Sequence, residues 1–412
     1  MQDVDERSPA SGFLLSGVAA LAAAAALALA ARWSHWSWAG IAALHLALIG
    51  GVSQLVLGAG QTFAAALLAT APTGRRVLAV QRGLWMVGTA LVVLGMSARW
   101  PVASLAGGAL LATTLGLFAA ALRAMQRRSL QRPVWGIRWY YACVVFLAAG
   151  GALGLQLARG VPWGHGDLLS AHVTLTVLGW LGTAIVGSLH TFFPTLSGRR
   201  LARARLEGPT FMAWTLGVAC LATGYLFALG PLAALGLLGL SAGALMLLAN
   251  VLRTARAPGR PLGLAAKLVL GGQLCLGIGL PLASSLAPLD PSQPFTGGVR
   301  GALAALLLAG WVGMTVAGSL LHLLPIAIRR PMAPPPWPLG LPWVRRRMPV
   351  VALCGVALLA SAQLAGSPPA AVVAKVVLAG CALVIGTALV RVAALRPRQD
   401  DARHQPHVVG HQ

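Results

Sequence analysis

Imidazole is the side chain in this sequence best suited to holding a metal or a cofactor, and the chain has nine of them. His45, His172, His190 and His322 fall within long apolar stretches, and the others fall in polar segments: His35, His165, His404, His407 and His411. A histidine inside a lipid bilayer is costly unless it is paired, hydrogen-bonded or bound to a metal. Each of the four is therefore a candidate functional residue. Neutral imidazoles from two facing helices are also what b-type haem requires.

The first candidate site combines His45 and His172, which lie near the outer ends of two long apolar segments. The pair is predicted to bind haem b or, alternatively, copper, with His165 or Asp167 completing the ligands of a copper ion. Arginine and tryptophan side chains on the same side could meet haem propionates: Arg32, Arg99, Arg159, Arg300, Trp36, Trp38, Trp100 and Trp163. Hydrogen bonds from each imidazole to Ser, Thr or carbonyl groups of neighbouring helices are the alternative interpretation.

A second candidate site combines His190 and His322, near the inner ends of their segments and at the level of Gln61. His172 and His190 are separated by about five complete α-helical turns, or roughly 27 Å of rise. They are expected on one helix face near opposite membrane surfaces, an arrangement suited to electron passage across the bilayer. The separation of His45 and Gln61 places them on nearly opposite faces of a helix, which argues against a symmetric two-haem arrangement. Hydrogen bonding between helices is the alternative for the His190 and His322 pair.

The elements that position these residues are predicted to lie in a membrane, because the composition excludes a soluble protein of this size. Hydrophobic residues make up 58% of the chain and charged residues 9%, against roughly 25% charged in an average soluble protein. The net charge of +23 does not indicate nucleic-acid binding, since the arginines form short clusters between apolar runs. The five cysteines stand singly with no CxxC, so zinc, disulfide and covalent c-type haem sites have no support.

Twelve apolar segments have about 20 residues or more, which is the length that spans a bilayer. They lie near 12–31, 37–70, 79–97, 101–124, 134–158, 168–195, 209–228, 230–251, 263–285, 297–327, 348–366 and 370–390. A Pro-rich loop is predicted at 331–343. We expect one transmembrane domain over 1–395 and a disordered cytoplasmic tail over 396–412.

Lys and Arg are distributed unevenly between the two ends of these segments. The loops after even-numbered segments, together with the termini, hold 26 of them, and the other side holds Arg32, Arg99, Arg159, Arg300 and Lys375. Because positive residues are retained on the cytoplasmic side, both termini are predicted in the cytoplasm, with the protein in the inner (plasma) membrane. The predicted membrane interior has no carboxylate, which argues against a proton pump or a proton-coupled carrier.

One sequence frame recurs in the sixth and tenth segments. GWLGTAIVGSLHTFFP at 179–194 and GWVGMTVAGSLLHLLP at 310–325 share GWxGxxxxGSL, then a His, then a Pro. A weaker third copy lies in the second segment, where GAGQ at 58–61 parallels GSLH at 187–190. Since these segments are four apart, the chain is predicted to form three parallel four-helix units, approximately 1–130, 131–260 and 261–395.

Twelve helices in three arcs of four, with histidines on the second, sixth and tenth, resemble the haem–copper oxidase subunit I superfamily. A closer resemblance is to the membrane domain at the N-terminus of some actinobacterial multicopper oxidases of the copper nitrite reductase type. The segments that carry it are LHLALIGGV (44–52), RWYYACV (138–144) and AHVTLTVLGWLG (171–182). The resemblance implies a subunit I-like helical fold, bound haem or copper, and a separate periplasmic cupredoxin, multicopper oxidase or cytochrome partner.

The chain departs from that superfamily where oxygen would react. Subunit I carries paired histidines on its seventh helix and an HxH at the outer end of its tenth. Here the seventh segment has none, and the tenth has His322 near its inner end. Oxygen reduction is therefore not expected.

We expect a membrane haem- or copper-binding protein, in electron transfer or in the handling of copper or nitrogen oxides. Two alternatives stay open. One is a small-solute transporter, for which Gly277, Gly279 and Pro281 form the one candidate helix break. The other is a cofactor-free scaffold or assembly subunit.

Overall fold

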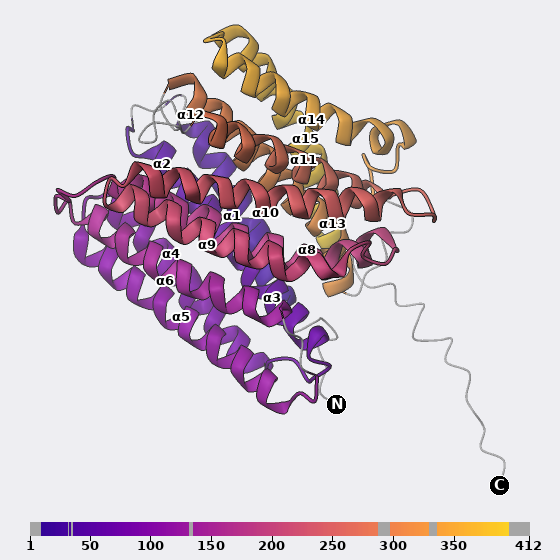
Figure 1. The fold of residues 1–412 in the computed structure, drawn as a ribbon, viewed down its shortest axis with the longest axis horizontal. Helices are drawn as coiled ribbons and strands as arrows, with labels where there is room; N and C mark the ends of the chain where they lie inside the picture. Colours follow the sequence, from indigo (N-terminus) through magenta and orange to yellow (C-terminus); the bar gives the residue numbers. More distant parts are fainter. Residues whose placement is uncertain are drawn as a thin grey trace.

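The computed structural model describes residues 10–31, 33, 36–131, 135–286, 297–328 and 336–394, whose regular structure is entirely helical (Figure 1). All twelve predicted segments form helices: α1 (Ser11–Ala30); α2, η1 and α3 (Ala39–His45, Leu46–Val52 and Ser53–Leu67); α4 (Arg75–Ser97); α5 (Pro101–Arg128); α6 (Gly136–Ala158); α7, η2 and α8 (Leu168–Val173, Thr174–Gly182 and Thr183–Ser197); α9 (Glu207–Leu226); α10 (Gly230–Arg256); α11 (Leu264–Leu286); α12, η4 and α13 (Gly297–Ala304, Ala305–Gly313 and Met314–Ala327); α14 (Pro342–Leu364); and α15 (Pro368–Ala394). A short 3-10 helix, η3 (Ala204–Leu206), precedes α9. The expectation of an all-helical fold is confirmed.

Eleven of these segments are long and apolar enough to cross a membrane. The remaining long helix, α9, has 20 residues, but it begins with Glu207, Gly208 and Pro209, which lower its mean hydropathy. This length and composition are those of a multi-pass membrane protein.

The second, sixth and tenth segments form the centre of the bundle. Within their most apolar windows, 50%, 72% and 61% of the residues are buried, and α11 also reaches 61%. The remaining candidate spans are only 11–44% buried, so most of their apolar surface is left for lipid. The histidine-bearing segments are therefore, together with α11, the ones most enclosed by protein.

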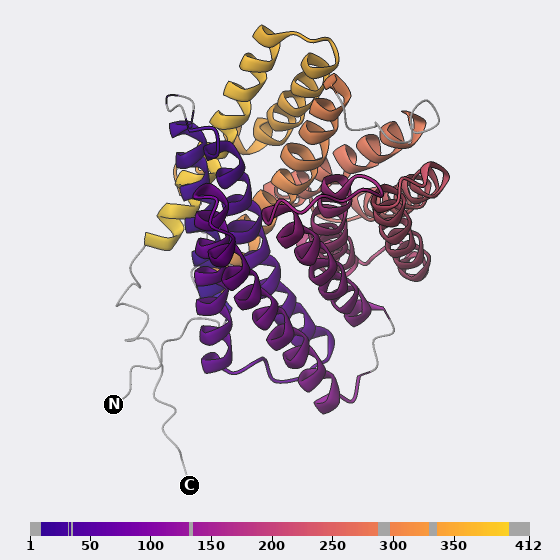
Figure 2. The same cartoon turned by 90° about the vertical axis from the view of Figure 1, so that its left-hand side faces the viewer.

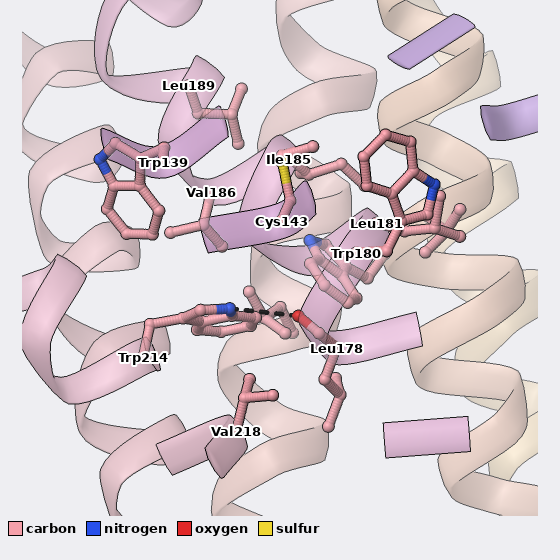
Figure 3. Packing of buried hydrophobic residues seen from close by; sticks show 14 of the residues in the cluster. Trp139, Cys143, Leu178, Trp180, Leu181, Ile185, Val186, Leu189, Trp214 and Val218 are labelled. Carbon is pink, nitrogen blue, oxygen red and sulfur yellow. Dashed lines mark hydrogen bonds between the residues drawn. The ribbon is translucent and has the colours of Figure 1, made fainter. Parts of the chain in front are cut away.

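Each of the three central segments changes from α-helix to π-helix partway along, at η1, η2 and η4, which lie at matching positions of the sequence repeat. Hydrogen bonds in a π-helix run from residue i to i+5, so some carbonyl groups leave the α-helical ladder. Tryptophan side chains of neighbouring helices donate hydrogen bonds to two of these carbonyl groups. Trp85 Nε1 of α4 donates to the Ile49 carbonyl (2.8 Å), and Trp214 Nε1 of α9 donates to the Leu178 carbonyl (3.2 Å; Figure 3).

The first and last helices share a hydrophobic cluster on one side of the bundle. Leu14 of α1 belongs to a hydrophobic cluster with Leu324 of α13 and Leu389 of α15. Figure 2 shows the indigo N-terminal helices beside the yellow C-terminal helix, although almost the whole sequence separates them. On another side, α9 and α10 form a tightly packed pair, where a Cβ at Gly236 would collide with the Leu221 backbone.

The helix break that the sequence suggested in α11 is absent, because this stretch is continuous helix. α11 runs through Gly277, Gly279 and Pro281 without interruption. The two glycines provide room for side chains of neighbouring helices, Leu248 of α10 and Leu307 of η4. Close approach of helices in lipid depends on such small residues.

Helix boundaries differ from the prediction mainly at the arginine-rich end of the bundle. α14 begins at Pro342, inside the stretch predicted as a Pro-rich loop, because proline is well tolerated in the first turn of a helix. α5 and α10 continue to Arg128 and Arg256, past the predicted ends at 124 and 251. Long Arg side chains can reach the headgroup region from a helix that extends beyond the hydrocarbon.

Candidate functional site

His45 and His172 lie near the outer ends of two neighbouring central segments, His45 directly before η1 and His172 two residues before η2. Further along the same two segments, Trp180 Nε1 donates to Ser53 Oγ at 2.8 Å, which joins them directly. The structure therefore places the two segments that carry His45 and His172 side by side.

Both imidazoles present the same nitrogen for binding. His45 Nδ1 lies 2.9 Å from the Ile41 carbonyl oxygen, and His172 Nδ1 lies 2.8 Å from that of Gly150. A carbonyl oxygen only accepts, so Nδ1 carries the proton and donates in each ring. The lone pair is then on Nε2, which is the tautomer of a neutral histidine that ligates a metal through Nε2.

A glycine pocket on α6 receives the ring of His172. A Cβ added at Gly154 would lie 2.7 Å from His172 Cε1, and Gly150 supplies the carbonyl that holds Nδ1. The sequence analysis did not identify this pocket. The feature of the sequence that indicates this pocket is the pair of glycines Gly150 and Gly154 on an apolar segment. Small residues four apart allow close approach of a neighbouring helix.

His165 and Asp167, the predicted additional copper ligands, have other roles in the structure. Both lie in the loop before α7. The Asp167 carboxylate accepts hydrogen bonds from Ser170 N (3.0 Å) and Ser170 Oγ (2.5 Å), so it caps α7. The His165 ring meets the Trp163 ring edge-on at 5.3 Å. Within the part of the chain that the structure describes, no three His, Cys, Asp or Glu side chains are grouped so as to hold a metal ion.

His190 is the most deeply buried of these histidines, with 3% of its surface exposed. Nδ1 donates to the Val186 carbonyl at 2.9 Å, and the ring stacks on Trp139 of α6 at 5.7 Å. Nε2 is buried without a hydrogen-bond partner among the described residues. His172 and His190 both contact α6, so the prediction that they share one face of their helix is confirmed.

His322, the predicted partner of His190, has different neighbours. Its ring meets the Phe192 ring edge-on at 5.7 Å, whereas Trp139 covers His190. Gln61, expected at this level, donates to the Gln81 side chain of α4 at 2.9 Å. Among the described residues, no ring contact or hydrogen bond joins the two imidazoles, so the second site stays a prediction.

Arg32 and His35, on the predicted outer side, lie outside the described residues. The same holds for His404, His407 and His411 of the C-terminal tail. Of the tryptophans predicted on the outer side, Trp36 and Trp38 stack at 5.3 Å. Trp163 Nε1 donates to the Leu226 carbonyl at 2.7 Å. Arg99 and Arg159 are exposed at the same end of the bundle as His45 and His172.

A cavity of about 80 Å³ lies where the second, sixth and tenth segments meet. Most of its lining falls into sets of three, with one member each from α3, α8 and α13. The sets are Leu55, Ala184 and Thr315; Val56, Ile185 and Val316; Ala59, Ser188 and Ser319; Gly60, Leu189 and Leu320; and Phe63, Phe192 and Leu323. Each set follows the alignment that pairs Gly58 with Gly187 and Gly318 in the sequence repeat, so equivalent positions of three helices face one cavity.

The sequence matches no protein-family model and no curated protein.

Proposed function

We propose that this protein binds haem b through His45 and His172 and carries electrons within the membrane. The supporting observation is the matching hydrogen bonding of the two imidazoles. They lie just before the π-helical stretches of two central segments, and both direct Nδ1–H to a backbone carbonyl. That leaves two Nε2 lone pairs, which is the ligand set of a bis-histidine haem.

We place haem ahead of copper for this site. A copper site usually takes three or more protein ligands. Here Asp167 is engaged as a helix cap, and the described residues contain no group of three His, Cys, Asp or Glu side chains. Copper through His45 and His172, with His165 or Asp167, remains the alternative for this site.

The residues of the chain have separate tasks in this proposal. His45 and His172 bind the iron, and the Gly150 carbonyl and Gly154 fix the orientation of His172. Exposed Arg99 and Arg159 supply positive charge for the propionates at the same end of the bundle. The bound group supplies one-electron redox chemistry. A group that both imidazoles would hold would suit electron transfer better than oxygen reduction.

We further propose the subunit I-like arrangement of three parallel four-helix units, with both termini in the cytoplasm. The matching π segments, the repeat-related cavity lining and the hydrophobic cluster shared by α1, α13 and α15 support the three units. The 26 Lys and Arg predicted at one side support the orientation. With the haem near the opposite side, the redox partner is a periplasmic cupredoxin, multicopper oxidase or cytochrome.

The test is the absorbance spectrum of the purified protein, oxidised and then reduced with dithionite, together with haem and copper contents. We expect b-type bands and about one haem per chain, lost in His45→Ala and in His172→Ala. His165→Ala is the matched control, because this exposed imidazole is not a haem ligand in the proposal.

Three outcomes separate the possibilities. Stoichiometric copper that is lost in all three histidine variants would replace haem with the copper alternative. The absence of both groups from a folded preparation would leave a scaffold or a transporter. Bands that persist in His45→Ala and His172→Ala would place the haem elsewhere.

A further inference from the structure

The predicted cytoplasmic side of the bundle carries far more positive charge than its own carboxylates can balance. It holds 26 Lys and Arg and six acidic residues: Asp3, Asp5, Glu6, Glu207, Asp400 and Asp401. Of these six, Glu207 is the one that lies within the described residues. Most of the arginines therefore need counter-charge from outside the chain, and the anionic headgroups of the cytoplasmic leaflet provide it.

Three of these arginines are concentrated at the end of one helix. Arg123, Arg127 and Arg128 of α5 are exposed and line one open hollow, the α5 hollow. Arg123 and Arg127 are about one turn apart, a spacing at which like charges repel each other and destabilise a helix. The C-terminal end of a helix carries only about half a negative charge, which does not offset three guanidinium groups. The α5 hollow therefore favours an anion.

The rest of the α5 hollow and the helix surface beside it suit a lipid. Ala120 and Ala124 are its other lining residues, and both are small and exposed. About one turn further into the predicted membrane, a Cβ added at Gly116 would meet nothing within 4 Å. α5 lies at the edge of the bundle, and only 28% of its most apolar window is buried (Figure 1). Acyl chains can therefore run along α5 beside the arginines.

We propose that the α5 hollow binds one anionic phospholipid of the cytoplasmic leaflet. The phosphate accepts charge-assisted hydrogen bonds from Arg123 and Arg127, because the planar guanidinium group offers paired N–H donors that match phosphate oxygens. The glycerol backbone lies over Ala120 and Ala124. The acyl chains follow the lipid-facing side of α5.

The test is native mass spectrometry of the full-length protein in detergent, with phosphatidylglycerol or phosphatidylcholine added. We expect the wild-type protein to bind one phosphatidylglycerol in preference to phosphatidylcholine. An arginine near an anionic lipid contributes about fivefold in affinity, so Arg123→Gln combined with Arg127→Gln should weaken phosphatidylglycerol binding by about 30-fold. Arg128 is kept in this variant, because its Nη2 donates to the Ala71 carbonyl at 3.5 Å.

Arg253→Gln combined with Arg256→Gln is the matched control. Both are exposed arginines in the last turn of α10, so this variant removes the same charge from the corresponding end of another helix. We expect it to retain the bound phosphatidylglycerol. Ala124→Leu is the complementary variant, since it keeps every arginine and fills the α5 hollow. It should weaken phosphatidylglycerol binding as well.

Four results would overturn the proposal. They are equal binding of the two lipids by the wild-type protein, equal weakening in the two double variants, unchanged binding in Ala124→Leu, and displacement of the lipid by inorganic phosphate, which would indicate a site for a soluble anion. If the α5 double variant does not fold, Ala124→Leu carries the same expectation.

The α5 hollow is on the predicted side opposite to His45 and His172, so it is independent of the proposed haem. Haem content is measured on the same preparations. A protein without haem that still prefers phosphatidylglycerol through α5 would refute the proposed function and leave this inference intact.

Discussion

The substitution Gly154→Ala tests how the structure positions His172. The new Cβ would lie 2.7 Å from His172 Cε1 and 3.0 Å from Nδ1. Carbon atoms in contact are separated by about 3.5 Å, so the ring must move by about 0.8 Å. The ring cannot turn away without breaking the 2.8 Å hydrogen bond from Nδ1 to the Gly150 carbonyl.

Loss of an outer interaction that orients a metal-ligating histidine typically costs about 10- to 100-fold in affinity. We expect that loss for haem in Gly154→Ala, equivalent to roughly 1.4–2.8 kcal/mol. The assay is titration of the haem-free protein, in lipid nanodiscs, with haem, followed by the Soret absorbance.

Gly151→Ala is the matched control for this prediction. Gly151 lies on the same helix, and a Cβ there would meet nothing within 4 Å. Both substitutions improve helix propensity by about 1 kcal/mol, so neither is expected to unfold α6 by itself. Equal haem affinity in Gly154→Ala and Gly151→Ala, with thermal stability retained, would refute the role given to the glycine pocket.

Two further predictions concern residues around the central helices. Trp214→Phe should lower the free energy of unfolding by about 1–3 kcal/mol more than Trp311→Phe, because Trp214 Nε1 donates to Leu178 whereas Trp311 Nε1 has no partner among described residues. Equal unfolding temperatures for the two variants in detergent would contradict this. Asp167→Ala should cost about 1 kcal/mol through loss of the α7 cap, and Asp167→Asn should retain it, with haem content unchanged in both. A metal lost in Asp167→Asn at normal stability would instead indicate a copper ligand.

The number and type of the elements could be predicted from the sequence because lipid imposes a simple condition. A span must be apolar for about 20 residues, and its backbone hydrogen bonds must be satisfied within it. All twelve segments form helices where they were expected. The ends were less predictable, as at Pro342, because helix termini in the headgroup region depend on caps and snorkelling side chains and not on hydropathy.

The candidate site was only partly predictable. His45 and His172 were identified because an imidazole is rare and costly in an apolar segment, and both lie near the outer ends of their segments. The roles of their neighbours depend on which helix lies beside which. That Gly154 receives the His172 ring, that Asp167 caps a helix, and that His322 meets Phe192 are facts of tertiary packing.

By itself the sequence determined a helical membrane bundle, the helices that carry the histidines, and a repeat among them. Only the tertiary structure decided the π segments, the tryptophans bonded to their carbonyls, and the cavity between three equivalent helices. Hydropathy is a property of each residue summed along one segment. A cavity or a freed carbonyl arises from the fit between segments far apart in the chain, which no single segment specifies.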